Sequence, residues 1–195
     1  MHPVRAASFV HSARRPLRTA EDSRGRVYVA HRGDHPLLRL NPDGSLDREI
    51  GAAHLRATTA YDLRGPVPKP IATRIWMHGL HVDAEDNVWI TDVGRHLVMK
   101  FDPAGELRLT LGTDGVFNQP TQVCTVPGGN FYVTDGYGNS RVVKFDARGR
   151  KLGEWGSRGV APGQFHTPHT IIRDARGRLC VTDRENDRIQ LFDED

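Results

Sequence analysis

Hydrophobic and polar residues alternate along short runs of this chain. The runs "VWITD" at 88–92, "FYVTD" at 131–135 and "LCVTD" at 179–183 are rich in β-branched and aromatic residues, as is typical of strands with alternating faces. Turn-forming tetrapeptides such as "NPDG" at 41–44 and "DPAG" at 102–105 separate other runs, because Asp or Asn caps a turn and glycine adopts a positive φ. No segment shows a sustained helical period, so the pattern predicts an all-β fold.

The runs belong to a repeated unit. Four stretches align with one another, at 21–46, 81–112, 124–156 and 172–195. The spacing between the Thr-Asp pairs of the last three stretches fits one four-stranded propeller blade of about 40–45 residues. We predict a partial β-propeller of four-stranded blades over 20–195, with 1–19 as an N-terminal segment that could join the first blade. The proline-containing range 52–76 is predicted to be an irregular insertion.

The repeats are fewer than a closed ring needs. About four of an expected six blades are present, and the last unit ends before its outermost strand. We therefore interpret the sequence as part of a longer protein that forms an open arc, because neighbouring repeats bury each other's faces.

Histidine occurs in alternate repeats at the start of the innermost strand. Alignment on the Thr-Asp pairs brings Leu17, His78, Thr121 and His169 to equivalent places. In a six-bladed ring, three histidines in alternate blades would surround the axis and form a zinc site with an open position. The other interpretation is a coincidence, or two histidines that hydrogen-bond near the channel mouth. Seven further histidines are expected at the surface or in loops: His2, His11, His35, His54, His81, His96 and His166.

Composition excludes some classes of protein. The net charge is +3, and the basic residues near the N-terminus, Arg18 included, suit a solvated terminus better than a nucleic-acid-binding arm. No stretch approaches the roughly 20 apolar residues that cross a membrane. The two cysteines, Cys124 and Cys180, are expected to be reduced. We predict a soluble protein, cytoplasmic by default, or secreted if its N-terminus is incomplete.

Several motifs resemble a known family. They are "HRGDH" at 31–35, "HGLHVDAEDNVWITDV" at 78–93, "FNQPTQV" at 117–123, "VTDGYGNSRVVKF" at 133–145, "GQFHTPH" at 163–169 and "LCVTDRENDRIQLF" at 179–192. The repeats resemble NHL repeats. Within that class the chain resembles the lyase domain of peptidylglycine α-amidating enzymes, peptidyl-α-hydroxyglycine α-amidating lyase, also called peptidylamidoglycolate lyase.

The resemblance implies an activity and a set of site residues. It implies a zinc-dependent lyase that cleaves the N–C bond of a peptidyl-α-hydroxyglycine, yielding a peptide amide and glyoxylate, with a structural calcium ion nearby. The substrate would be a small peptide or amide, and a hydroxylase is a possible partner. His78 and His169 match two of three zinc ligands, and the backbone carbonyl of Leu80 matches a calcium ligand. The resemblance assigns catalytic roles to Tyr137, Arg32 and Arg184.

The chain also departs from the family pattern. A third zinc histidine would lie beyond Asp195. Gly138 and Asn118 stand where the family has one disulfide, and Leu191 replaces the partner of Cys180 in another. The sequence therefore leaves a second hypothesis open, a non-catalytic NHL-repeat propeller that binds a protein or small ligand.

Overall fold

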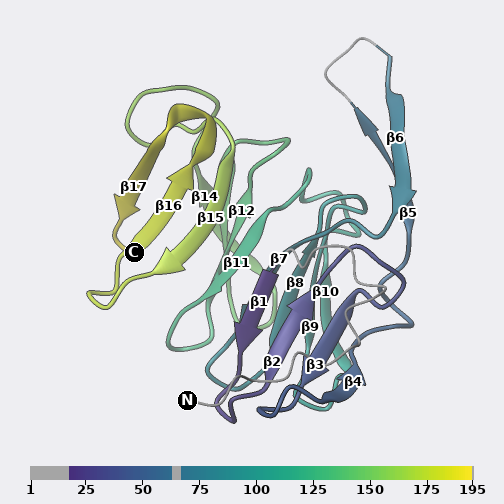
Figure 1. The fold of residues 1–195 in the computed structure, drawn as a ribbon. Helices are drawn as coiled ribbons and strands as arrows, with labels where there is room; N and C mark the ends of the chain where they lie inside the picture. The colour runs from purple at the N-terminus through teal and green to yellow at the C-terminus, as the bar shows by residue number, and fades with distance from the viewer. Residues whose placement is uncertain (1–17, 63–66, 195) are drawn as a thin grey trace.

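The strands form separate antiparallel sheets that stand side by side (Figure 1). The structure is a computed structural model that describes residues 18–62 and 67–194. Three sheets have four strands and one has three, which confirms the prediction of about four propeller blades and of an incomplete last repeat within the described residues. Of the predicted N-terminal segment 1–19, residues 1–17 lie outside the described part of the chain, and Arg18 and Thr19 belong to the first strand of blade one.

The blades follow chain order, and each of their strands pairs with the next. Blade one contains β1 (Arg18–Glu21), β2 (Val27–Ala30), β3 (Leu37–Leu40) and β4 (Leu46–Glu49). Blade two contains β7 (Met77–Val82), β8 (Val88–Asp92), β9 (Leu97–Phe101) and β10 (Leu107–Leu111). Blade three contains β11 (Gln122–Thr125), β12 (Phe131–Asp135), β13 (Arg141–Phe145) and β14 (Lys151–Trp155). Blade four contains β15 (Pro168–Arg173), β16 (Leu179–Asp183), the 3-10 turn η2 (Arg184–Asn186) and β17 (Arg188–Phe192).

The first strand of every blade lies on the inner side of the arc. Strand β7 contacts both β1 and β11, and β11 contacts β15. The four inner strands therefore stand next to one another in chain order, and residues near their starts gather at one rim.

Aspartates at the ends of strands hold the turns in place. Asp135 is fully buried; its Oδ1 accepts a hydrogen bond from the Asn118 amide at 2.8 Å and its Oδ2 accepts one from Arg141 Nε at 3.1 Å. Asp92 and Asp183 have the same kind of backbone and arginine partners in blades two and four. These aspartates are therefore structural, because a buried carboxylate is tolerated when it is hydrogen-bonded and paired.

Apolar side chains fill the spaces between consecutive blades. Tyr28 and Phe101 belong to the cluster of blades one and two, and Trp89 packs against Phe131 in the next cluster, with tilted rings whose centroids are 4.6 Å apart. Tyr132 and Leu179 belong to the cluster of blades three and four. Each blade thus covers one face of its neighbour, as in other repeat proteins.

The prediction of an irregular insertion at 52–76 is wrong in part. The range contains a hairpin of β5 (Thr58–Asp62) and β6 (Lys69–Arg74) that projects away from the blades (Figure 1). The prolines suggested a loop, but Pro70 pairs with Tyr61 beside a register shift of this two-stranded sheet. Proline is compatible with strand pairing at edges and irregularities, where its missing N–H is not needed.

Both cysteines are free thiols, as predicted. Burial raises the pKa of the Cys124 thiol to about 11, so it is unreactive at neutral pH. The positions that correspond to the family's disulfides do lie together: the Gly138 amide donates to the Asn118 carbonyl at 3.0 Å, and Cys180 is opposite Leu191 in the sheet. Among the described residues, no helix has the length and apolar character needed to cross a membrane.

Candidate functional site

Two histidines and a tyrosine meet at the rim where the inner strands begin. His78 is the second residue of β7, His169 is the second residue of β15, and Tyr137 follows the end of β12. The Tyr137 hydroxyl lies 3.0 Å from His78 Nε2 and 3.1 Å from His169 Nε2, and the two Nε2 atoms are 3.1 Å apart. Three polar atoms from three blades therefore form one compact triangle.

A backbone carbonyl fixes the orientation of His78. Its Nδ1 lies 2.8 Å from the Thr121 carbonyl oxygen, which can only accept a hydrogen bond, so Nδ1 carries the proton. Burial lowers the pKa of His78 to about 4, and the positive charges of Arg18 and Arg32 add to this effect. At neutral pH His78 is therefore uncharged, and its Nε2 presents a lone pair to the rim, where the Tyr137 hydroxyl lies 3.0 Å away.

His169 and Tyr137 are more accessible than His78. His169 is half-buried, and burial lowers its pKa, with Arg184 and Arg18 contributing. The Tyr137 side chain is 39% exposed and its ring meets that of His169 edge-on. Because the hydroxyl has one hydrogen and two nitrogen neighbours, Tyr137 can donate a hydrogen bond to only one of them at a time.

The donor atoms of the two histidines fit a zinc ion. Zinc binds imidazole nitrogen at about 2.0–2.1 Å, so two nitrogens of a tetrahedral site lie about 3.3 Å apart, close to the 3.1 Å between the Nε2 atoms of His78 and His169. The Thr121 carbonyl is the kind of outer partner that orients metal-binding histidines. Within the described part of the chain, no third His, Cys, Asp or Glu completes a cluster with them, so the residues present supply two nitrogen ligands.

Arg32 and Arg184 lie at the same rim as the triangle. Arg32 Nε donates to the Met77 carbonyl at 3.2 Å and its guanidinium lies 5.2 Å from the Trp76 ring centre. The Arg184 guanidinium lies 6.0 Å from the Tyr137 ring centre. The structure thus brings both arginines near the histidines and tyrosine that the sequence pointed to.

The backbone of Leu80 already has a side-chain partner. Its carbonyl accepts a hydrogen bond from Gln122 Nε2 at 3.1 Å, while Gln122 Oε1 is buried without a partner among the described residues. A carbonyl and an amide oxygen are ligand types that calcium uses. Calcium at Leu80 remains a prediction.

Sequence reasoning missed several contributors. Thr121 acts through its backbone, which no sequence motif reveals. Arg18 was interpreted as part of a solvated terminus, although it follows directly on the position aligned with the histidines. His81 was expected at the surface or in a loop, but it lies in β7 and its Nε2 is 2.8 Å from Thr125 Oγ1. In a strand, the residue three positions after His78 faces a different neighbour.

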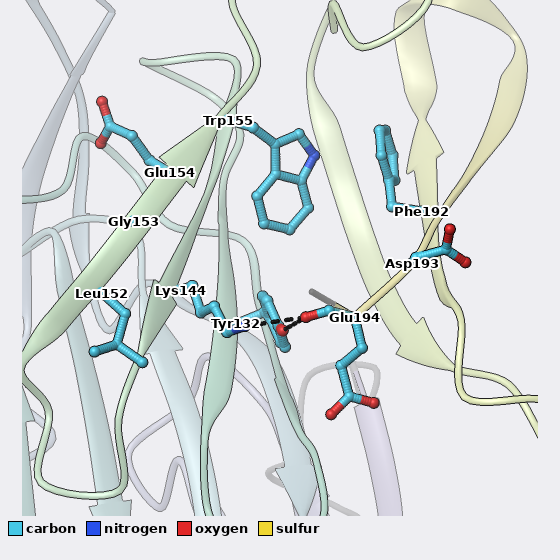
Figure 2. Close-up of a pocket in the computed structure, with 9 residues that line it drawn as sticks. All are labelled: Tyr132, Lys144, Leu152, Gly153, Glu154, Trp155, Phe192, Asp193 and Glu194. Atoms are coloured by element: carbon cyan, nitrogen blue, oxygen red, sulfur yellow. Dashed lines mark hydrogen bonds between the residues drawn. The ribbon is translucent and has the colours of Figure 1, made fainter.

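A separate groove of about 540 Å³ lies between the outer parts of blades three and four (Figure 2). Figure 2 shows Trp155 facing Phe192 across it, and the Tyr132 hydroxyl and Lys144 ammonium donating to the Glu194 carbonyl. None of the predicted site residues lines this groove. The groove is therefore distinct from the rim site.

The fold and the repeats define the class of this protein. It is a β-propeller with NHL-type blades: the NHL repeat model matches residues 117–145. The solved structure of streptogramin B lyase superposes with a TM-score of 0.69 at 16% identity, over 97% of this chain and 54% of that chain. At this identity the likeness concerns the fold alone.

Curated relatives agree with the resemblance seen in the motifs. The chain is 36% identical to peptidyl-glycine alpha-amidating monooxygenase B of Xenopus laevis, over 89% of this chain and 22% of the relative. It is 42% identical to peptidyl-alpha-hydroxyglycine alpha-amidating lyase 1 of Drosophila melanogaster, over 59% of this chain and 25% of the relative. It is 35% identical to NHL repeat-containing protein 3 of Mus musculus, over 88% and 49%. The chain resembles an amidating-lyase domain and spans about a fifth to a half of these relatives.

Proposed function

We propose that this chain provides the rim of a zinc-dependent lyase site that cleaves the N–C bond of a peptidyl-α-hydroxyglycine. The observation that carries the proposal is the triangle of His78, His169 and Tyr137, with all three sides between 3.0 and 3.1 Å. A relative named as an amidating lyase, 42% identical over its matched part, supports the same reaction.

The histidines would hold the metal, and the metal would supply Lewis acidity to the α-hydroxyl of the substrate. His78 is prepared for this role because its lone pair faces the rim and its pKa keeps it neutral. The Tyr137 oxygen, within hydrogen-bond distance of both Nε2 atoms, would act as general base: in its deprotonated form it would accept the proton of the α-hydroxyl.

Loss of the α-hydroxyl proton leads to cleavage of the C–N bond, and the atoms and electrons of this step balance. The oxygen electron pair forms the C=O bond of glyoxylate, the C–N bond breaks, and its electron pair stays on nitrogen. The amide nitrogen takes up a proton, which balances the proton lost from the hydroxyl group, and no oxidant is needed. Arg32 and Arg184 offer planar donor pairs suited to a carboxylate or a developing negative charge.

Two further elements belong to the same proposal. Calcium would bind near the Leu80 carbonyl as a structural ion. A hydroxylase would supply the α-hydroxyl group, in keeping with the monooxygenase in the name of the Xenopus laevis relative.

A second candidate function is binding without catalysis. The mouse relative at 35% identity is named only for its NHL repeats and is matched over 88% of this chain. In this alternative the rim of exposed Tyr137 and its arginines would bind a ligand that is not cleaved. The proposed function predicts bound metal, which the alternative does not require.

Metal analysis tests the proposal most directly. We expect about one zinc per chain in the purified protein and none in the His78→Ala/His169→Ala double variant, followed by glyoxylate release from an N-acyl-α-hydroxyglycine. Protein free of zinc that also fails to bind added zinc would contradict the lyase mechanism and favour the binding module.

A further inference from the structure

The charges around the rim site are unbalanced. Arg18, Arg32 and Arg184 each act on His78 or His169, and Glu185 is the acidic side chain that acts on His169. Arg184 Nε lies 2.9 Å from the Glu185 carboxylate, so these two charges largely offset each other. With three arginines and one carboxylate, the described part of the rim is positive and favours an anion.

Arg18 sits at this rim by its place in blade one. It is the first residue of the inner strand β1, which lies beside β7, the strand of His78. Its sheet partner is Ala30, two residues before Arg32, so both arginines lie at the end of blade one where the inner strands begin. The neighbouring position Leu17 aligns with His78 and lies outside the described residues.

Arg18 differs from the other two arginines in what holds it. Arg32 donates to the Met77 carbonyl and lies over the Trp76 ring, while Arg184 is paired with Glu185. In the ranges 18–62 and 67–194, no carboxylate lies within ion-pair distance of Arg18, which is half-buried. Its guanidinium therefore keeps its donors for a ligand.

We propose that Arg18 binds the carboxylate group of the substrate at this rim, next to the triangle of His78, His169 and Tyr137. The assignment rests on the proposed function, whose substrate ends in a carboxylate. Arg18 begins β1, which lies beside β7, and His78 is the second residue of β7. A carboxylate bound to Arg18 would thus lie next to the start of the His78 strand.

The test compares a charged and a neutral probe. N-acetylglycine has the carboxylate but no hydroxyl to react, and N-acetylglycinamide is its neutral counterpart. Binding of each is measured by NMR chemical-shift titration of the 195-residue chain. We expect Arg18→Met to weaken N-acetylglycine binding about tenfold, as for loss of one charge-assisted contact, and to leave amide binding unchanged. Arg18→Lys should retain part of the affinity.

Arg24→Met is the matched control, because Arg24 is exposed in the β1–β2 turn of the same blade and the charge change is equal. Equal N-acetylglycine affinity in Arg18→Met and wild type, or equal losses in Arg18→Met and Arg24→Met, would overturn the role of Arg18. If that happens while glyoxylate release persists, the lyase proposal stands. Anion binding through Arg18 without glyoxylate release would instead contradict the lyase proposal alone.

Discussion

His78 and His169 occupy the same register position in blades two and four, yet their surroundings differ. In both blades the next residue donates its amide hydrogen to the strand threonine, from Gly79 to Thr91 Oγ1 at 2.7 Å and from Thr170 to Thr182 Oγ1 at 2.9 Å. His78 is buried and fixed by the Thr121 carbonyl of blade three, whereas His169 is half-buried. A blade can therefore fix the histidine of the blade before it in the chain, as blade three does for His78 through the Thr121 carbonyl.

Tyr137 connects the two histidines, so its hydroxyl should have the largest effect on catalysis. Tyr137→Phe removes the atom that lies 3.0–3.1 Å from both Nε2 atoms. We expect glyoxylate release to fall by about 10²–10⁴-fold, the usual contribution of a general base, while zinc content is unchanged. Loss of zinc together with activity would show instead that Tyr137 serves as a ligand.

Zinc affinity separates the two histidines from the other eight. His78→Ala or His169→Ala should weaken zinc binding by at least about a hundredfold, more than the 10–100-fold cost of losing an outer partner. His54→Ala is the control, since His54 is exposed. Competition with a chelator of known affinity measures the zinc affinity of each variant. An equal loss of zinc affinity in His54→Ala and in His78→Ala would place the metal elsewhere.

Titration should distinguish the buried from the half-buried histidine in metal-free protein. The pKa of His78 is lowered to about 4, that of His169 is lowered, and that of His35 is raised by Glu49. By NMR, His35 should gain its proton first as the pH falls, then His169, then His78. An ordinary titration of His78 near pH 6.5 would show that Thr121 does not hold it buried in solution.

The lowered pKa of His78 also affects the free energy of unfolding. Between pH 6.5 and about 4 the unfolded chain binds a proton at His78 that the folded chain does not. The folded state is therefore favoured above pH 6.5, by about 3 kcal/mol for this group, and loses that contribution as the pH falls toward 4. His78→Gln should flatten the pH dependence of the urea midpoint over this window.

The sequence predicted the blades and the two histidines because both are local signals. Strand alternation and Asp-containing turns repeat along the chain, and the Thr-Asp pairs recur in the last three units, so the sequence itself predicts the register that makes His78 and His169 equivalent. The Thr121 carbonyl and the gathering of Arg18 with Arg32 depend on how separate blades meet. No pattern within one repeat contains that information, and the β5–β6 hairpin was missed because its prolines suggested a loop.

The smallest expected effect tests the comparison at the level of single hydrogen bonds. Thr91 is fully buried; it accepts from the Gly79 amide and donates to the Thr121 carbonyl at 3.1 Å, whereas Thr182 is half-buried and its hydroxyl lies 3.5 Å from the Thr170 carbonyl. Thr91→Val should cost about 1–3 kcal/mol of unfolding free energy, because it leaves a buried amide without an acceptor, and Thr182→Val less than about 1 kcal/mol.

Urea denaturation of the two variants measures this difference. Both changes replace a hydroxyl by a methyl group of similar size, so cavity effects largely cancel between them. Thr91→Val should also loosen the link between β7 and β11 that positions the Thr121 carbonyl, and because the hydrogen bond to this carbonyl raises the pKa of His78, weakening it should lower that pKa further. Equal losses of stability in the two variants would mean that blade three does not hold His78 more firmly than His169 is held, and the contrast between the two histidines would then reduce to exposure alone.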